Sequence, residues 1–177
     1  RNRRSIYALK LRGQRDPFMT TFNQPGPDKS CELRDSSNVT PQVFTLFNSE
    51  ESADRALPFT ARILKEGKND KAVVQRAFRL AFGRVPEAGE TRAALSHWRQ
   101  ATTEQAKRKP KPAVYPRQVT RQANEENTGQ PFTFTEKLFE YQDYEPDLQP
   151  HQVDARTRGL ADLCLVLLNS SEFVYVY

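Results

Sequence analysis

The feature of this sequence that most constrains its fold is the C-terminal stretch from Gly159 to Tyr177, the most apolar run of an otherwise polar chain. Four leucines recur there at helical spacing, and mostly apolar residues lie between them. A helix that is apolar nearly all round is one that other elements surround. The stretch therefore predicts a central, buried helix, which Asp154 caps and Asn169 ends in a left-handed conformation. The apolar positions are Leu160, Ala161, Leu163, Cys164, Leu165, Val166, Leu167 and Leu168.

The rest of the chain carries the start and stop signals of further helices. Asp16-Pro17 and Thr40-Pro41 are pairs typical of a helix N-terminus, and Gly83 is a typical helix end. Pro58 should kink or divide the helix that contains it. The expected helices span residues 16–23, 40–47, 48–65 (capped by Asn48), 71–82 (capped by Asp70), 87–107 and 117–127, and the last one follows Asp154.

Composition and patterning together predict the fold class. Only 37% of the residues are hydrophobic, and 12 prolines favour long loops. The alternation in Ser5 to Leu11 predicts an extended arm lying across helices. We therefore expect an all-α fold, an irregular helical domain with long loops, a short extended N-terminal arm and a buried C-terminal helix. Residues 1–177 should form one domain at the end of a longer chain, with 108–155 as an insertion-like, loop-rich segment.

The core of this domain is expected where the last helix meets the helix of residues 71–82. Leu163, Leu167, Phe78 and Phe82 should be nearly fully buried in one cluster. The apolar run of the last helix is too short to span a bilayer, so no membrane span is expected.

Six basic residues and no acid occupy the first fifteen positions: Arg1, Arg3, Arg4, Lys10, Arg12 and Arg15. Such an arm could contact phosphate or another anionic polymer, or it could be solvated or paired internally. No stacking platform of several aromatics accompanies the charges, which disfavours nucleic acid. The preferred interpretation is internal pairing. At least one arginine of the arm should contact an acid between Glu136 and Asp147, or Glu172.

The two cysteines, Cys31 and Cys164, leave two alternatives open. They are either free thiols or the ends of one long-range disulfide. A disulfide closing so long a loop would contribute about 4–5 kcal/mol and would require an oxidising compartment. Two cysteines exclude a zinc site built mainly from thiolates.

Catalytic motifs are absent from the sequence, and we assign no catalytic, cofactor-binding or metal-binding residue. His97 and His151 lack a second ligand at metal spacing, and no nucleophile elbow or glycine-rich phosphate loop occurs. Five carboxylates cluster beside aromatics, as in a glycosidase, but this pattern is more typical of a solvated acidic loop. They are Glu136, Glu140, Asp143, Glu145 and Asp147.

Four blocks of the sequence, residues 2–7, 38–48, 77–86 and 160–175, occur in the order found in one family. The chain resembles the C-terminal domain of unknown function of large secreted planctomycete proteins, in which a cytochrome-c-like module lies upstream. The resemblance implies an exported helical domain, periplasmic or extracellular, with residues 124–134 as an insertion found in part of the family. The haem attachment pattern Cys-x-x-Cys-His is absent here, so any haem c would belong to the upstream part.

These observations favour a non-catalytic structural or interaction module at the C-terminal end of an exported multidomain protein. Two alternatives are part of an extracytoplasmic enzyme acting on polysaccharide, and a module that binds an anionic polymer. The expected partners are the upstream domains of the same parent chain, other proteins, or an anionic polymer.

Overall fold

The computed structural model describes residues 5–7, 10–26, 28, 30–33, 37 and 39–175, apart from the side chain of Glu140. The described chain is mostly helical, with one small antiparallel hairpin. Its helices are α1 (Pro17–Thr21), α2 (Thr40–Asn48), α3 (Glu50–Glu66), α4 (Asp70–Phe82), α5 (Ala88–Lys107), α6 (Ala155–Leu168) and α7 (Ser171–Val174). The strands are β1 (Gln118–Asn124) and β2 (Pro131–Lys137), and short 3-10 turns occur at Ser5–Tyr7, Phe139–Tyr141 and Pro150–Gln152.

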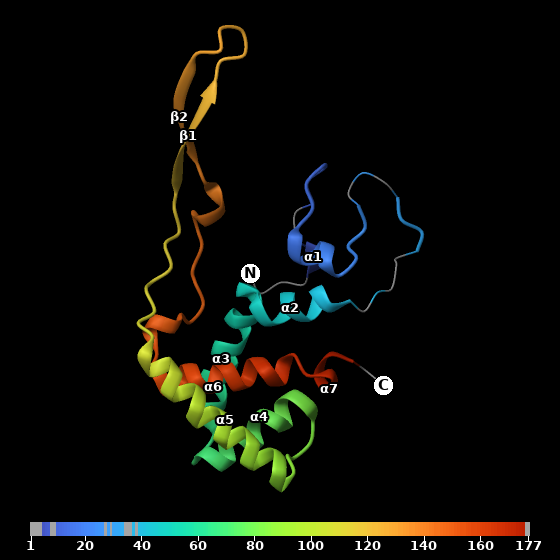
Figure 1. Cartoon of the computed structure of the whole chain (residues 1–177), viewed down its shortest axis with the longest axis vertical. Helices are drawn as coiled ribbons and strands as arrows, with labels where there is room; N and C mark the ends of the chain where they lie inside the picture. The colour runs from blue at the N-terminus through green and yellow to red at the C-terminus, as the bar shows by residue number, and fades with distance from the viewer. Residues whose placement is uncertain are drawn as a thin grey trace.

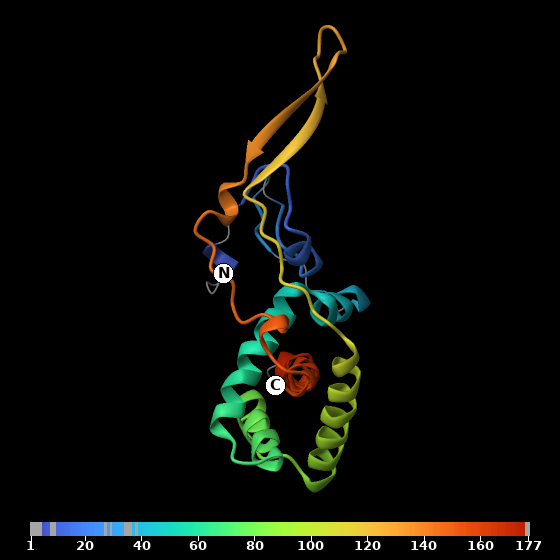
Figure 2. The ribbon, with the colours of Figure 1, turned by 90° about the vertical axis from the view of Figure 1, so that its left-hand side faces the viewer.

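The central element is α6, as the apolar C-terminal stretch predicts. Figure 2 looks along this helix and shows α3 and α4 on one side and α5 on the other. The half-buried Ala161, Leu165 and Leu168 widen its apolar surface, so three neighbouring helices can pack on it. Its fully buried residues share one broad face of the helix. They are Gly159, Leu160, Leu163, Cys164 and Leu167.

The core prediction is confirmed for three of its four residues. Leu163, Leu167 and Phe78 are 4%, 6% and 5% exposed and belong to one cluster. Phe82 packs edge-on against Phe78 but is only partly buried. Phe82 is the last residue of α4, and a helix end is covered by fewer neighbours than a helix middle.

The capping signals place the helices well. The carboxylate of Asp16 accepts a hydrogen bond from the backbone N of Met19 at 2.9 Å, and that of Asp154 accepts one from Thr157 at 2.8 Å. Gly83 closes α4 with a φ of +73°, a conformation that glycine adopts without strain. Each of these positions agrees with the sequence-based expectation.

Some expected caps are shifted by one residue. Ser49 rather than Asn48 caps α3, because Asn48 is still the last residue of α2. Asn69 rather than Asp70 caps α4, through a hydrogen bond from Ala72. Pro58 lies inside α3, which continues without a break from Glu50 to Glu66.

The hairpin corrects the all-α expectation and replaces the helix expected at 117–127. Strands β1 and β2 pair antiparallel, with Thr120 opposite Thr135. The carboxylate of Glu125 accepts hydrogen bonds from the backbone N atoms of Asn127 and Thr128, and Gly129 has a φ of +69°. This tight turn reverses the chain, so Gly129 serves a hairpin rather than ending a helix. Figure 1 shows the hairpin projecting from the helical body.

Two further details differ at the chain ends. Ser5 to Tyr7 forms one 3-10 turn rather than an extended segment, and residues 1–4, 8 and 9 of the expected arm lie outside the described residues. Asn169 does end α6, but with a φ of −107° rather than in the left-handed region, and its side chain donates to the carbonyl of Leu165. Within the described residues, no helix has the length and apolarity needed to cross a membrane.

Candidate functional site

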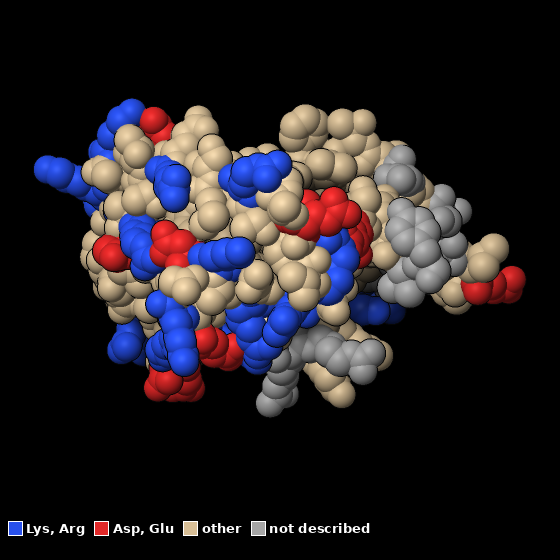
Figure 3. Space-filling view, turned by 90° about the horizontal axis from the view of Figure 1, so that it is seen from below, with Lys and Arg blue, Asp and Glu red and all other residues tan. Residues whose placement is uncertain are grey.

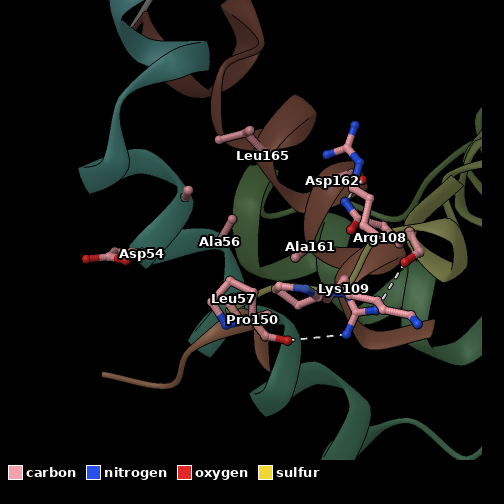
Figure 4. Close-up of a pocket in the computed structure, with 13 residues that line it drawn as sticks. Asp54, Ala56, Leu57, Arg108, Lys109, Pro150, Ala161, Asp162 and Leu165 are labelled. Carbon is pink, nitrogen blue, oxygen red and sulfur yellow. Dashed lines mark hydrogen bonds between the residues drawn. The ribbon is translucent and has the colours of Figure 1, made fainter. Parts of the chain in front are cut away.

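One cavity of about 320 Å³ lies between α3, the C-terminal end of α5 and α6. Its walls are largely apolar, and Figure 4 shows Ala56, Leu57, Ala161 and Leu165 facing it. Ala53, Pro110 and Pro150 complete the apolar lining, and the two prolines belong to the segments that lead to and return from the hairpin. The cavity thus adjoins both the helical body and the base of the hairpin.

Arg158 is fixed in the wall of this cavity by backbone carbonyls. One terminal nitrogen donates to the carbonyls of Val153 and Pro150, and the other donates to Gln105 at 3.1 Å. The carbonyl of Gln105 lies in the last turn of α5, where a cation is favoured by the helix dipole. Arg158 therefore joins the ends of α5 and α6, and no described carboxylate neutralises its charge in an ion pair.

Asp162 is the acid of α6 that lines the cavity. One of its carboxylate oxygens accepts a hydrogen bond from the side chain of Gln105 at 2.8 Å. Gln105 is only 9% exposed, so this bond satisfies a buried amide. Asp54 also borders the cavity, but in Figure 4 its carboxylate points away from it.

The second candidate surface is the hairpin of residues 118–137, which we call the hairpin arm. Because successive side chains of a strand point to opposite faces, the register assigns the arm two different faces. One face carries apolar residues and one ion pair, and the other carries uncharged polar residues, Lys137 and Pro131. The first face holds Val119, Arg121, Ala123, Phe132, Phe134 and Glu136. The second face holds Gln118, Thr120, Gln122, Asn124, Pro131, Thr133, Thr135 and Lys137.

The aromatic residues of the arm are nearly half exposed. Phe132 and Phe134 are 47% and 41% exposed, and their ring centroids lie 5.9 Å apart. The edges of the arm are open as well. The backbone N atoms of Glu125 and Leu138 donate to the carbonyls of Gln130 and Arg117, which fixes the alternation of the ladder. Thr133 and Thr135 therefore point their backbone groups outward. The arm therefore offers an aromatic patch and free strand edges.

The structure does not bring the predicted carboxylates into a catalytic pair. Glu136 forms an ion pair with Arg121 at 2.7 Å, and Asp147 forms one with Arg55 at 2.8 Å. Asp143 and Glu145 are exposed, and the side chain of Glu140 lies outside the described part of the chain. No described pair of these acids faces the cavity, which is lined by Asp54 and Asp162 instead.

The predicted pairing of the basic N-terminal arm can be followed only in part. Arg1, Arg3 and Arg4 lie outside the described residues, whereas Arg12 and Arg15 are exposed and form no ion pair with a described acid. The expected partners are engaged elsewhere. Glu172 pairs with Arg84, and the acids at 136 and 147 pair as given above.

Arg84 organises the most extensive of these charge clusters. Its guanidinium donates to both oxygens of Glu90 at 2.7 Å and to both oxygens of Glu172 at 2.6 and 2.8 Å. It also lies 5.6 Å from the ring centroids of Phe78 and Phe82. The hydrogen bonds from Arg84 lower the pKa of Glu90 to about 2 and also lower that of Glu172. The cluster joins α4, α5 and α7 and serves structure.

The underside of the helical body carries further charges of both signs. Figure 3 shows basic and acidic side chains interspersed on this face. Among the described pairs, Glu66 accepts hydrogen bonds from both Arg62 and Arg76, which lowers its pKa. Alternating charges of this kind do not form the single-sign surface that an anionic polymer would need.

Both cysteines are free thiols in the structure. Cys31 is exposed, and Cys164 is buried in α6. Burial raises the pKa of Cys164 to about 12, and a hydrogen bond with Thr60 opposes this only in part. A buried thiol of this kind packs as a small apolar side chain.

Metal and haem ligation find little support among the described residues. His97 and His151 are both exposed, and no group of three or more His, Cys, Asp or Glu side chains in the described ranges could hold a metal ion. A covalently bound haem does not fit either, because one thiol is buried in the core and neither cysteine adjoins a histidine.

Neither candidate surface was predicted from the sequence. The cavity depends on residues from three distant segments, 53–57, 105–110 and 158–165, and no local pattern joins them. The arm did leave a signal, since Phe132-Thr-Phe-Thr alternates and is preceded by Asn127-Thr-Gly129. An alternating run after such a turn is a hairpin signature.

Comparison with known proteins identifies one family. A family model described as PSD1, protein of unknown function (DUF1553), matches residues 1–98, more than half of the 177 residues. No curated protein and no solved structure was found to match the chain. The hairpin arm and α6 lie beyond the matched residues.

Proposed function

The chain belongs to this family of proteins of unknown function, and on that premise we propose that it is a non-catalytic interaction module at the C-terminal end of an exported multidomain protein. The observation that carries the proposal is the hairpin arm, which stands away from the helical body and exposes Phe132 and Phe134. Exposed aromatics on a projecting element are typical of a surface that a partner covers.

The stability of the arm supports the same conclusion. A two-stranded hairpin without further packing is marginal in water. Within the arm the cross-strand contacts are modest: an ion pair between Arg121 and Glu136, and a hydroxyl contact between Thr120 and Thr135 at 3.4 Å. A partner that covers Phe132 and Phe134 would add the apolar burial that the isolated arm lacks.

The partner we propose is an upstream domain of the same parent chain, in the periplasm or outside the cell. The sequence resemblance to secreted planctomycete proteins with an upstream cytochrome-c-like module supports this choice. A domain on the same chain is present at high effective concentration, so a small aromatic patch can suffice for docking.

The test compares hydrogen exchange of residues 118–137 in the parent protein and in the isolated 177-residue chain. Docking should slow exchange of the arm in the parent protein. The double variant Phe132→Ser and Phe134→Ser should abolish that protection, whereas Thr133→Ser and Thr135→Ser on the opposite face should not. Equal exchange of the arm in both proteins would refute the proposed docking.

A further inference from the structure

We propose that the cavity between α3, the end of α5 and α6 binds a small ligand with an apolar body and one carboxylate. Its volume of about 320 Å³ lies at the lower end of the range, about 300–1,000 Å³, that small-molecule pockets occupy. The lining by Ala56, Leu57, Ala161 and Leu165 favours an aliphatic or aromatic body over a sugar or nucleotide.

The charge around the cavity selects the head group. Arg108, Lys109 and Arg158 line it, and none of the three forms an ion pair with a residue of the described chain. Asp162 lines the cavity beside these cations and already accepts a hydrogen bond from Gln105. Asp154 and Glu104 lie near Arg158 and Arg108 outside the lining and form no ion pair with them. The carboxylate of Asp54 points away (Figure 4). The excess of positive charge therefore favours an anionic group over a neutral or cationic one.

The arrangement of the cations supports binding rather than mere solvation. Arg158 is held by the carbonyls of Pro150, Val153 and Gln105, so its charge stays in the cavity wall. Asp154 lies near enough to attract it but forms no ion pair with it. Arg108 and Lys109 follow directly after the end of α5, on the segment that leads to the hairpin arm. A carboxylate at this end would meet one fixed and two adaptable cations while its apolar body lies against α3 and α6.

The experiment uses three probes with the same eight-carbon chain: octanoate, octanamide and octylammonium. Binding to the 177-residue chain is measured by calorimetry and by backbone amide shifts in NMR spectra. We expect octanoate to shift amides of residues 53–57, 105–110 and 158–165, and to bind about tenfold more tightly than octanamide. Octylammonium should bind most weakly.

Matched variants separate the two parts of the site. Arg108→Gln with Lys109→Gln should reduce octanoate binding to the level of octanamide and leave octanamide unchanged. Lys71→Gln with Lys137→Gln removes the same charge from exposed positions elsewhere and should have no effect. Ala161→Leu should fill the cavity and weaken both octanoate and octanamide, with its fold checked by circular dichroism.

Three results would overturn the proposal. Equal affinity for octanoate and octanamide would show that the cavity does not recognise a carboxylate. Tightest binding of octylammonium would show that Asp162 dominates the cavity. Shifts confined to residues outside the cavity would place binding elsewhere. Each outcome is independent of the hairpin arm, so it leaves the proposed docking function untouched.

Discussion

Gly159 of α6 and Thr102 of α5 are so close that a Cβ atom added at Gly159 would lie 2.5 Å from the backbone N of Thr102. It would also lie 2.6 Å from the Thr102 hydroxyl oxygen. The backbone atom cannot rotate away, so the two helices would have to separate. Gly159 therefore sets the closest approach of α5 to the central helix, and its role is packing rather than backbone flexibility.

Gly159→Ala should destabilise the protein by about 1–3 kcal/mol, because the added methyl group forces α5 and α6 apart. The free energy of unfolding is measured by urea titration. Gly89→Ala is the matched control, since Gly89 also lies in a helix but nothing is within 4 Å of its added Cβ. The control should stabilise slightly, by about 0.5–1 kcal/mol. Equal effects at the two sites would contradict the close approach.

Leu167→Ala should cost about 2–5 kcal/mol, because it leaves a cavity in the core cluster. Its neighbour Val166 is 42% exposed, whereas Leu167 is 6% exposed, so Val166→Ala should cost less than about 1 kcal/mol. Both are measured by denaturant titration of the whole chain. A loss near zero for Leu167→Ala would mean that α6 is peripheral to the fold.

The central position of α6 could be predicted because its apolar residues cover most of the helix surface within one local stretch. Helix starts such as Asp16-Pro17 and Asp154 were also predictable from a short stretch of sequence, because a capping side chain bonds only to residues two or three positions away. Shifts of one residue arose where polar residues adjoin, as at Asn48 and Ser49, because either side chain could cap.

The hairpin arm and the cavity could not be predicted in the same way. Residues 117–127 contain helix-compatible polar residues, and the choice of strand depends on pairing with 131–137, across the turn. The cavity depends on the packing of α3 against α6, together with the end of α5. Ion pairs also join distant segments: Glu172 pairs with Arg84, and Asp147 pairs with Arg55.

The stability of the protein should fall on acidification partly through Glu90. Arg84 lowers the folded-state pKa of Glu90 to about 2 from an ordinary value of 4.5. A lowered carboxylate pKa stabilises the fold at every pH above 4.5, and this contribution is lost as the pH falls from about 4.5 to about 2. Glu90→Gln should therefore flatten the decline of the urea midpoint between pH 5 and pH 2.

Glu51→Gln is the control for this titration, because Glu51 is an exposed acid in the first turn of α3, outside the Arg84 cluster. Its midpoint should decline with pH as steeply as that of the unmodified chain. Parallel curves for Glu90→Gln and the unmodified chain would show that the bond to Arg84 does not stabilise the folded state.

The two thiols should differ sharply in reactivity. Cys31 is exposed, whereas Cys164 is buried and burial raises its pKa to about 12, so its reactive thiolate is scarce near neutral pH. With Ellman's reagent the folded protein should show one fast-reacting thiol, and the variant Cys31→Ser should lack it. The second thiol should react only after the protein is unfolded in urea without reductant. If unfolding released no thiol at all from protein purified without reductant, Cys31 and Cys164 would be joined in the disulfide that this structure lacks.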